Sequence, residues 1–312
     1  MISKTHFKQN HESIGVVFTL TSALLWGIFP IVVNAWSGAF PPLLFGAVIS
    51  LCTAVGSIIW MIARGKTHEL RNTKSYFSLF MVSMCIVCIP SILFFIGTSQ
   101  TSGINSSVLM LSEIVFTLIF TPFIGEKNTT QKYIGSLGIL VGGGLVLYKG
   151  GGIDLNTGDI LILLSTFTFP IGNFYSKRAL YYVSPSVVLS VRYTIGGLGI
   201  LVASLLLETQ TEPWQNIGSY LPFFILVGGI LLTTCKVTFY EGMKRLDISK
   251  VISLEMTYPF FSVMALYFIF DQHISWYQLA GICIMVLGAF YSMKRKSETH
   301  DALKYIPKSN LK

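Results

Sequence analysis

The strongest constraint on this chain is a series of long apolar runs that carry almost no charge in their interiors. One run covers residues 14–33 and another covers residues 39–63. Each is long enough to cross about 30 Å of hydrocarbon as a helix. Charged residues make up only 12% of the sequence, which is about half of their usual share in soluble domains. The sequence therefore predicts an all-α polytopic membrane protein.

The apolar runs divide the chain into ten predicted transmembrane helices. Their connections are mostly short, so neighbouring spans are expected to be antiparallel. The predicted spans are residues 14–34, 39–63, 77–98, 104–124, 132–148, 157–176, 184–207, 218–240, 250–270 and 275–293. The remaining ends, residues 1–13 and 294–312, are predicted to be polar tails.

The formal net charge of +8 would suggest a nucleic-acid partner in a soluble protein. Here the basic residues lie between the apolar runs, which favours a topology signal instead. If the N-terminus is cytoplasmic, both tails and every second connection are also cytoplasmic. These segments contain all Lys and Arg residues except Lys149, Arg192 and Lys236. This asymmetry follows the positive-inside rule. We therefore expect both termini in the cytoplasm and no nucleic-acid partner.

The two halves of the chain repeat each other at a nearly constant offset. A shift of 143 to 146 positions aligns Gly15 with Gly158, Ser22 with Ser165, Pro42 with Pro185, Gly135 with Gly281, and Gly142 with Gly288. The predicted units are residues 14–148 and 157–293, with five spans each. An odd number of spans makes the second unit inverted relative to the first. Two inverted five-helix repeats are typical of secondary transporters, whose solute site lies at the repeat interface near the midplane.

Several short motifs accompany this architecture. They are Ser22-Ala23-Leu24-Leu25-Trp26-Gly27 in the first span, Gly125-Glu126 followed by Gly135, and Gly158-Asp159, Ser184-Pro185 and Arg192 in the second half. Over residues 14–293 the chain resembles the EamA type of the drug/metabolite transporter superfamily. The resemblance implies a carrier in a bacterial inner (plasma) membrane. Such a carrier exports or exchanges small metabolites, such as amino acids or related amphipathic compounds, by alternating access.

The chain also departs from the family pattern at three places. Position 49, which corresponds to Arg192, is Ile. Glu113 stands in the fourth span where the family often has Pro, whereas the ninth span keeps Pro259. The second Gly-Glu pattern is replaced by Phe270-Asp271.

Four charged residues stand out well inside the predicted spans, away from the span ends, where charges are expensive and normally face a cavity or a partner. They are Glu113, Arg192, Lys236 and Glu255. With a rise of about 1.5 Å per residue, Glu113 lies close to the midplane and the other three share a layer in the cytoplasmic half. We expect them to line the solute path, with at least one oppositely charged pair. The alternatives are that Arg192 and Lys236 snorkel to the interface and that Lys236 and Glu255 form a structural pair.

Uncharged residues add candidates for solute contact. Pro30 and Pro170 interrupt the first and sixth spans, and such breaks are tolerated where a helix lines a cavity. The candidates are Trp26, Asn34, Asn173, Tyr240 and Tyr258. An asparagine near a break offers donors and acceptors, and an aromatic ring could stack on a solute. The alternative for the aromatic residues is helix packing or an interfacial belt.

Glycines concentrate in spans five and ten. They are Gly135, Gly138, Gly142, Gly143, Gly144, Gly281 and Gly288. Small residues let transmembrane helices approach closely. We predict that these glycines pack helices, within a monomer or at a homodimer face, and bind no solute.

The sequence lacks the usual signatures of catalysis and of ATP use. All five His residues lie in predicted loops or tails, no Asp lies in a span core, and no GxxxxGK loop occurs. We expect no catalytic residue, no metal site and no cofactor. Cys85 and Cys88 share a helix face but have no further ligand. An intramembrane enzyme and a channel or receptor remain as alternatives to a transporter.

Protons are the predicted coupling ion. Desolvation favours the protonated form of a carboxylate, and Glu113 has no basic residue in its own span between Ile104 and Ile124. We expect Glu113 to carry the proton, with Glu255 as the alternative.

Overall fold

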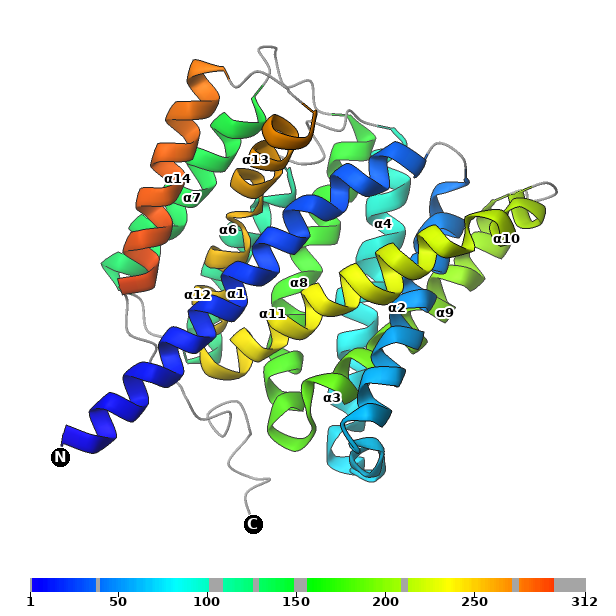
Figure 1. Cartoon of the computed structure of the whole chain (residues 1–312), viewed down its shortest axis with the longest axis horizontal. Coiled ribbons are helices and arrows are strands. Elements are labelled where there is room, and N and C mark those ends of the chain that lie inside the picture. Colours follow the sequence, from blue (N-terminus) through cyan, green and yellow to red (C-terminus); the bar gives the residue numbers. More distant parts are fainter. Residues whose placement is uncertain are drawn as a thin grey trace.

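The structure is a computed structural model that describes residues 2–37, 40–100, 109–125, 129–148, 156–208, 213–270 and 275–294. Every regular element in these ranges is a helix (Figure 1). The predicted all-α class is therefore confirmed for the described part of the chain.

The helices of the first half follow the predicted apolar runs. They are α1 (Ile2–Ser37), α2 (Pro42–Ala63), η1 (Thr67–Arg71), η2 (Thr73–Ser75), α3 (Tyr76–Val82), η3 (Ser83–Cys88), α4 (Ile89–Thr98), α6 (Ser112–Phe120), η4 (Thr121–Ile124) and α7 (Thr130–Leu147). The segments α3, η3 and α4 form one continuous helical run, as the predicted third span requires.

The second half has the same order of long helices. They are α8 (Thr157–Tyr182), α9 (Pro185–Leu207), α10 (Pro213–Phe224), η5 (Ile225–Leu232), α11 (Thr233–Arg245), α12 (Ile248–Glu255), α13 (Tyr258–Phe270) and α14 (Trp276–Lys294). Each of the ten predicted spans overlaps at least one described helix.

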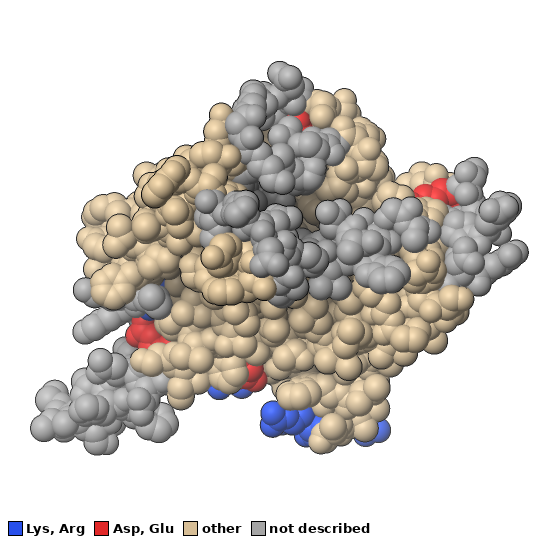
Figure 2. Space-filling view, turned by 45° about the horizontal axis from the view of Figure 1, so that its top comes forward, with Lys and Arg blue, Asp and Glu red and all other residues tan. Residues whose placement is uncertain are grey.

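Five described helical stretches are long and apolar enough to cross a membrane by themselves. They are Glu12–Phe29, Pro42–Ala63, Thr73–Thr98, Pro185–Leu207 and Gly218–Arg245. Ser112–Ile124 and Trp276–Ser292 are apolar but shorter. Figure 2 shows a broad surface without charges, with Lys and Arg gathered at its lower edge. Five crossings meet the length criterion, and the full set of ten stays a prediction.

The antiparallel helices α2 and α9 begin in the same way. Each starts with a proline, Pro42 or Pro185, whose missing N–H is not needed in a first turn. The following N–H groups of α2 donate to Glu208, which lies just after α9: Leu43 N to Oε1 at 2.7 Å and Leu44 N to Oε2 at 3.0 Å. Glu69, which lies after α2, accepts from the Ser184 N–H before α9 at 2.5 Å. A carboxylate near one helix end thus caps the start of the other helix.

Two segments, η3 and η5, are π-helical, and each lies in the middle of the third predicted span of its half. Pro90 explains the first, since it cannot donate to the carbonyl group four residues earlier. The second contains the glycine pair Gly228 and Gly229. Such wide turns often mark functional regions of a helix.

The ninth predicted span, residues 250–270, is not one helix. Helix α12 ends at Glu255, Met256 and Thr257 form a turn, and α13 starts at Tyr258. Pro259 is the physical cause, because it removes a backbone donor and crowds the preceding turn. The prediction of a continuous helix there was wrong, and the break leaves Glu255 at a helix end.

Two antiparallel pairs lie at opposite sides of the bundle, α7 with α14 and α2 with α9 (Figure 1). The α7–α14 seam is held by glycines. A Cβ atom at Gly142 would lie 2.6 Å from the Gly281 carbonyl oxygen, and one at Gly288 would lie 2.8 Å from the Gly135 carbonyl oxygen. The predicted packing role is confirmed within the chain for six of these seven glycines, whereas no described atom lies within 4 Å of a Cβ atom at Gly144. Between the two pairs lie α1, α8 and α11.

Candidate functional site

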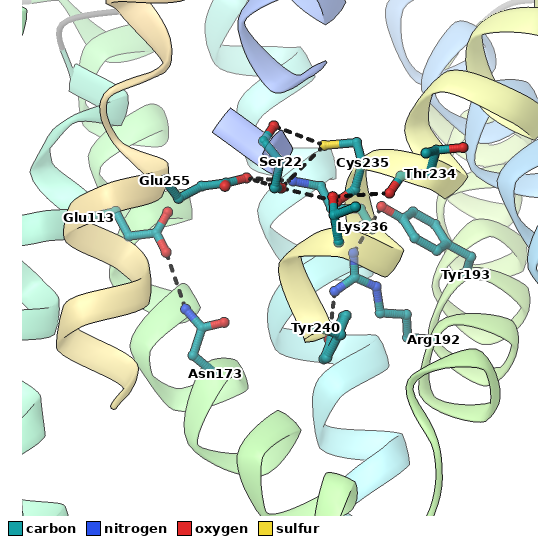
Figure 3. A network of polar contacts seen from close by, with 11 residues as sticks. Ser22, Glu113, Asn173, Arg192, Tyr193, Thr234, Cys235, Lys236, Tyr240 and Glu255 are labelled. Carbon is teal, nitrogen blue, oxygen red and sulfur yellow. Dashed lines mark hydrogen bonds and ion pairs between the residues drawn. The ribbon is translucent and has the colours of Figure 1, made fainter. Parts of the chain in front are cut away.

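A cluster of polar side chains lies in the centre of the bundle, and we call it the polar layer (Figure 3). Its side chains come from α1, α6, α8, α9, α11 and α12, so both halves of the sequence contribute. Its members are Ser22, Glu113, Asn173, Arg192, Tyr193, Cys235, Lys236, Tyr240 and Glu255. All of them are buried except Lys236, whose side chain is 13% exposed.

Lys236 and Glu255 form the central ion pair, with Nζ and Oε1 separated by 3.6 Å. The prediction of at least one oppositely charged pair is therefore confirmed. Ser22 Oγ donates to the same Oε1 atom at 2.9 Å. The Lys236 ammonium also lies 3.6 Å from the centre of the Trp26 ring, a cation–π contact. The second carboxylate oxygen, Glu255 Oε2, has no hydrogen-bond partner among the described residues.

Glu113 lies in the first turn of α6, where the helix dipole favours a negative charge. Its Oε1 atom accepts a hydrogen bond from Asn173 Nδ2 at 3.2 Å. In the described part of the chain no cationic nitrogen lies within 4.0 Å of it, although Lys236 and Glu255 interact with it electrostatically over a longer range. The structure therefore brings together two of the predicted site residues, Glu113 and Asn173.

Arg192 is 2% exposed, so the alternative that it snorkels to the interface is wrong. Its Nη1 atom donates to the Tyr240 hydroxyl at 2.7 Å and its Nη2 atom donates to the Tyr193 hydroxyl at 2.9 Å. The guanidinium carbon lies 4.5 Å and 5.0 Å from the centres of those two rings. The Tyr240 hydroxyl is also hydrogen-bonded to Ser176 at 3.0 Å. The Nε atom has no partner among the described residues.

The other predicted contacts lie around this layer. Trp26 stacks on Phe29 with ring centres 5.1 Å apart, and it meets Lys236. Tyr258 is buried and interacts electrostatically with Glu113. The backbone of Asn34 belongs to α1, but its side chain lies outside the described residues. The structure therefore places Trp26 and Tyr258 near the charged residues, whereas solute contact by Asn34 stays a prediction.

Sequence reasoning missed Ser22, Tyr193 and Lys177 as residues with specific contacts. Ser22 precedes Trp26 by one helical turn, so the two share a face, and that spacing was the available signal. Tyr193 had no signal beyond its place next to Arg192. Lys177, which was taken as part of a basic connection, is fully buried and donates to the carbonyl groups of Met243 and Leu246.

An apolar groove of about 640 Å³ lies apart from the polar layer, between α6, η4 and α7. Ile114, Leu118, Ile134 and Leu137 are among its lining residues. Its lining offers almost no polar group. The chemistry of the site therefore lies in the charged centre and not in this groove. Among the described residues no group of three His, Cys, Asp or Glu side chains could hold a metal ion.

The sequence model of the EamA-like transporter family matches this chain twice, over residues 13–148 and 156–293. Curated relatives agree with this match. The chain is 23% identical over 276 residues to an uncharacterized transporter, YvbV, of Bacillus subtilis, covering 84% of this chain and 86% of that protein. It is 22% identical to a probable amino-acid metabolite efflux pump of Salmonella typhimurium, covering 88% of this chain and 93% of that protein.

A solved crystal structure has the same fold. It superposes with a TM-score of 0.74 at 19% sequence identity, and the match covers 90% of this chain and 96% of that one. At this identity the likeness speaks for the fold alone.

Proposed function

This chain belongs to the EamA-like transporter family, and from that premise we propose that it is a secondary active transporter that exports or exchanges small metabolites. The family places it among integral membrane proteins that handle small-molecule solutes. Amino acids or related amphipathic compounds are the proposed solutes. The Salmonella typhimurium relative, a probable amino-acid metabolite efflux pump, supports that class.

The observation that carries the proposal is the polar layer itself. Four charged side chains from four helices are held in the centre of an apolar bundle, where each would be expensive without a function or a partner. Helix breaks or wide turns accompany them: Glu255 ends α12, and η5 precedes α11. In membrane proteins such breaks are tolerated where a helix borders a cavity or packs on protein.

Alternating access requires two units that rock against each other, and we propose the predicted inverted repeats for this role. The packing supports a two-fold relation. Helix α1, the first span of the first half, packs on α11 in the third span of the second half. Helix α8, the first span of the second half, packs on α4 in the third span of the first half, so the two pairs correspond when the halves are exchanged. A Cβ atom at Gly97 would lie 2.8 Å from the Gly158 carbonyl oxygen, and one at Gly242 would lie 3.2 Å from the Gly15 carbonyl oxygen. Gly15 corresponds to Gly158 at a shift of 143 positions and Gly97 corresponds to Gly242 at a shift of 145, so these two contacts correspond to each other when the halves are exchanged.

We propose proton coupling through Glu113. Its carboxylate is buried and is hydrogen-bonded to a neutral amide, and no described cation lies within ion-pair distance of it. Glu255, by contrast, has Lys236 and Ser22 as partners. An intramembrane carboxylate of the first kind can exchange a proton when the cavity opens to either side.

The test is transport by the purified full chain in proteoliposomes. Labelled neutral amino acids should accumulate against their gradient when a pH gradient is imposed, and accumulation should collapse with a protonophore. Protein-free vesicles are the control. Conductance that is not coupled to accumulation would instead indicate a channel, and no solute movement across the whole panel would contradict the proposed function.

The orientation is a separate proposal, with both termini in the cytoplasm of a bacterial plasma membrane. In Figure 1 helix α1 begins, and α14 ends, at the same lower side of the bundle. Reporter fusions at Lys74, Lys177 and Lys296 should read cytoplasmic, and a fusion at Thr211 should read external. An internal signal at Thr211 would contradict the ten-span topology.

A further inference from the structure

The guanidinium of Arg192 has more donors than the described protein atoms use. An arginine side chain carries five N–H groups. Here Nη1 and Nη2 each donate to one tyrosine hydroxyl, and Nε donates to none. The side chain is nevertheless 2% exposed. A buried cation with unused donors is costly unless another group completes its hydrogen bonds.

The carboxylates of the polar layer do not supply that group. Glu255 is paired with Lys236, and Glu113 is bonded to Asn173. Among the described residues no carboxylate oxygen lies within 4.0 Å of Arg192, and its electrostatic partners are the phenol groups of Tyr193 and Tyr240. Arg192 therefore has no neighbouring counter-charge in the part of the chain that the structure describes.

The geometry points to Arg192 as the subsite that holds the carboxylate of the solute. This inference rests on the proposed transport function and names the chemical class of its solutes as small organic monocarboxylates, zwitterionic amino acids included. A guanidinium binds a carboxylate through two parallel N–H donors, and Nε is available for one of them. The two tyrosine hydroxyls fix the orientation of the guanidinium plane before a solute binds.

The charge balance favours a carboxylate over a phosphate ester. Lys236 is already compensated by Glu255, and Glu113 carries no charge while it holds its proton, so in that state a single negative charge matches Arg192. A dianion would leave an uncompensated negative charge in a low-dielectric region, which is strongly unfavourable. The neighbouring ammonium of Lys236 is held over the Trp26 ring, and it is not assigned to bind the carboxylate of the solute.

The first experiment needs no variant. Thermal unfolding of the purified full chain is measured with neutral amino acids and short monocarboxylates, each compared with its primary amide, which lacks the negative charge. Ligands that bind the folded state raise its unfolding temperature. At least some acids should raise it, and their amides should not. Equal stabilisation by acids and amides, or no stabilisation by any acid, would overturn the inference.

Three variants locate the effect. Arg192→Gln should weaken the binding of the stabilising acids by about thirtyfold or more, since it removes one partner of a buried charge pair. Arg192→Lys should keep part of the affinity. Arg178→Gln is the matched control, because the Nε atom of Arg178 also has no described partner but that residue follows Lys177 near the end of α8, outside the polar layer. If Arg192→Gln folds and responds to acids as the wild type does, the inference is wrong.

Transport separates this inference from the proposed function. If vesicles accumulate amides as well as acids, the chain is a transporter and Arg192 is not its carboxylate subsite. If acids stabilise the wild type but no compound is accumulated, the binding site stands and the transport proposal falls.

Discussion

The α7–α14 seam and the polar layer are built from opposite kinds of residue inside the same bundle. In the seam, glycines remove side chains so that two backbones touch, and the close contacts involve backbone atoms. In the layer, large polar side chains are brought together, and two of their atoms, Glu255 Oε2 and Arg192 Nε, have no hydrogen-bond partner among the described residues. The seam therefore has the features of a fixed contact, whereas the layer keeps hydrogen-bonding capacity that a solute or a proton can use. Changes in the seam should act on folding, and changes in the layer should act on transport.

The largest effect is expected from Glu113→Gln. The amide keeps the shape and hydrogen bonding of the side chain but cannot titrate, so accumulation driven by a pH gradient should be abolished while solute exchange partly remains. Unfolding temperature should change little. Accumulation with unchanged pH dependence in this variant would show that Glu113 is not the coupling site and would leave a packing role across helices.

The seam predicts a loss of stability without a specific transport defect. A Cβ atom at Gly142 would lie 2.5 Å from the Met285 backbone nitrogen, so Gly142→Ala must push α14 away and should cost about 1–3 kcal/mol. Gly144 is the matched control on the same helix, since no atom of the described residues lies within 4 Å of its Cβ position. Gly144→Ala should be neutral or slightly stabilising. Denaturation monitored in detergent checks both, and equal effects of the two changes would contradict the assignment of the seam.

The seam and the layer also differ in how far the sequence could predict them. Apolar runs fix where helices lie along the chain, and the repeat aligned the glycine pairs of α7 and α14. The Lys236–Glu255 pair followed from similar depth and from the cost of a lone charge. Depth, however, says nothing about rotation around the helix axis when every face is apolar. For that reason the partners of Arg192 and the bond from Ser22 could not be predicted.

Breaks in the backbone were harder to place than the helices. Pro259 was visible in the sequence, but proline also occurs within helices, as Pro170 does in α8. Whether a helix bends or breaks depends on its neighbours, which a single sequence does not give. The burial of Lys177 was missed for a related reason. A lysine at the end of an apolar run normally reaches water, and only the fold shows that carbonyl groups of the α11 end accept from it.

A smaller effect should come from the hydroxyl groups of two buried serines. Ser22 donates to Glu255, and Ser22→Ala should lower the unfolding free energy by about 1–2 kcal/mol because it removes a bond to a charged group. Ser57 is the control, since its buried hydroxyl has no described partner. Ser57→Ala should be neutral or stabilising by up to about 1 kcal/mol. Only Ser22→Ala should alter solute affinity, because only Ser22 touches the layer. Equal responses of the two variants would remove Ser22 from the site.

The smallest effect concerns Glu69, which lies outside the membrane-spanning helices and caps α9. Partial burial alone would raise the pKa of this carboxyl, but the Ser184 N–H and the Lys66 ammonium, 3.0 Å away, outweigh it and lower the pKa below its ordinary value. A carboxylate with a lowered folded-state pKa stabilises the protein fully above its unfolded pKa of about 4.3 and loses that stabilisation as the pH falls through the folded value.

Glu69→Gln should therefore cost no more than about 1 kcal/mol at neutral pH, since the cap is close to the surface and its lysine partner is partly exposed. The stability difference between wild type and variant should be constant above about pH 5.5 and should shrink as the pH is lowered below about 4.5. Unfolding temperatures measured over this range test the prediction. Lys66→Met, which removes one of the two stabilising partners, should show a smaller loss of stability than Glu69→Gln, with the same sign.

Between pH 6 and 8 the transport of Glu69→Gln should follow the wild type, because this residue belongs to the helix framework and not to the polar layer. A shifted transport profile in that range would place a titrating group of the transport cycle at the start of α9, outside the polar layer, and would contradict the separate roles of the helix framework and the layer.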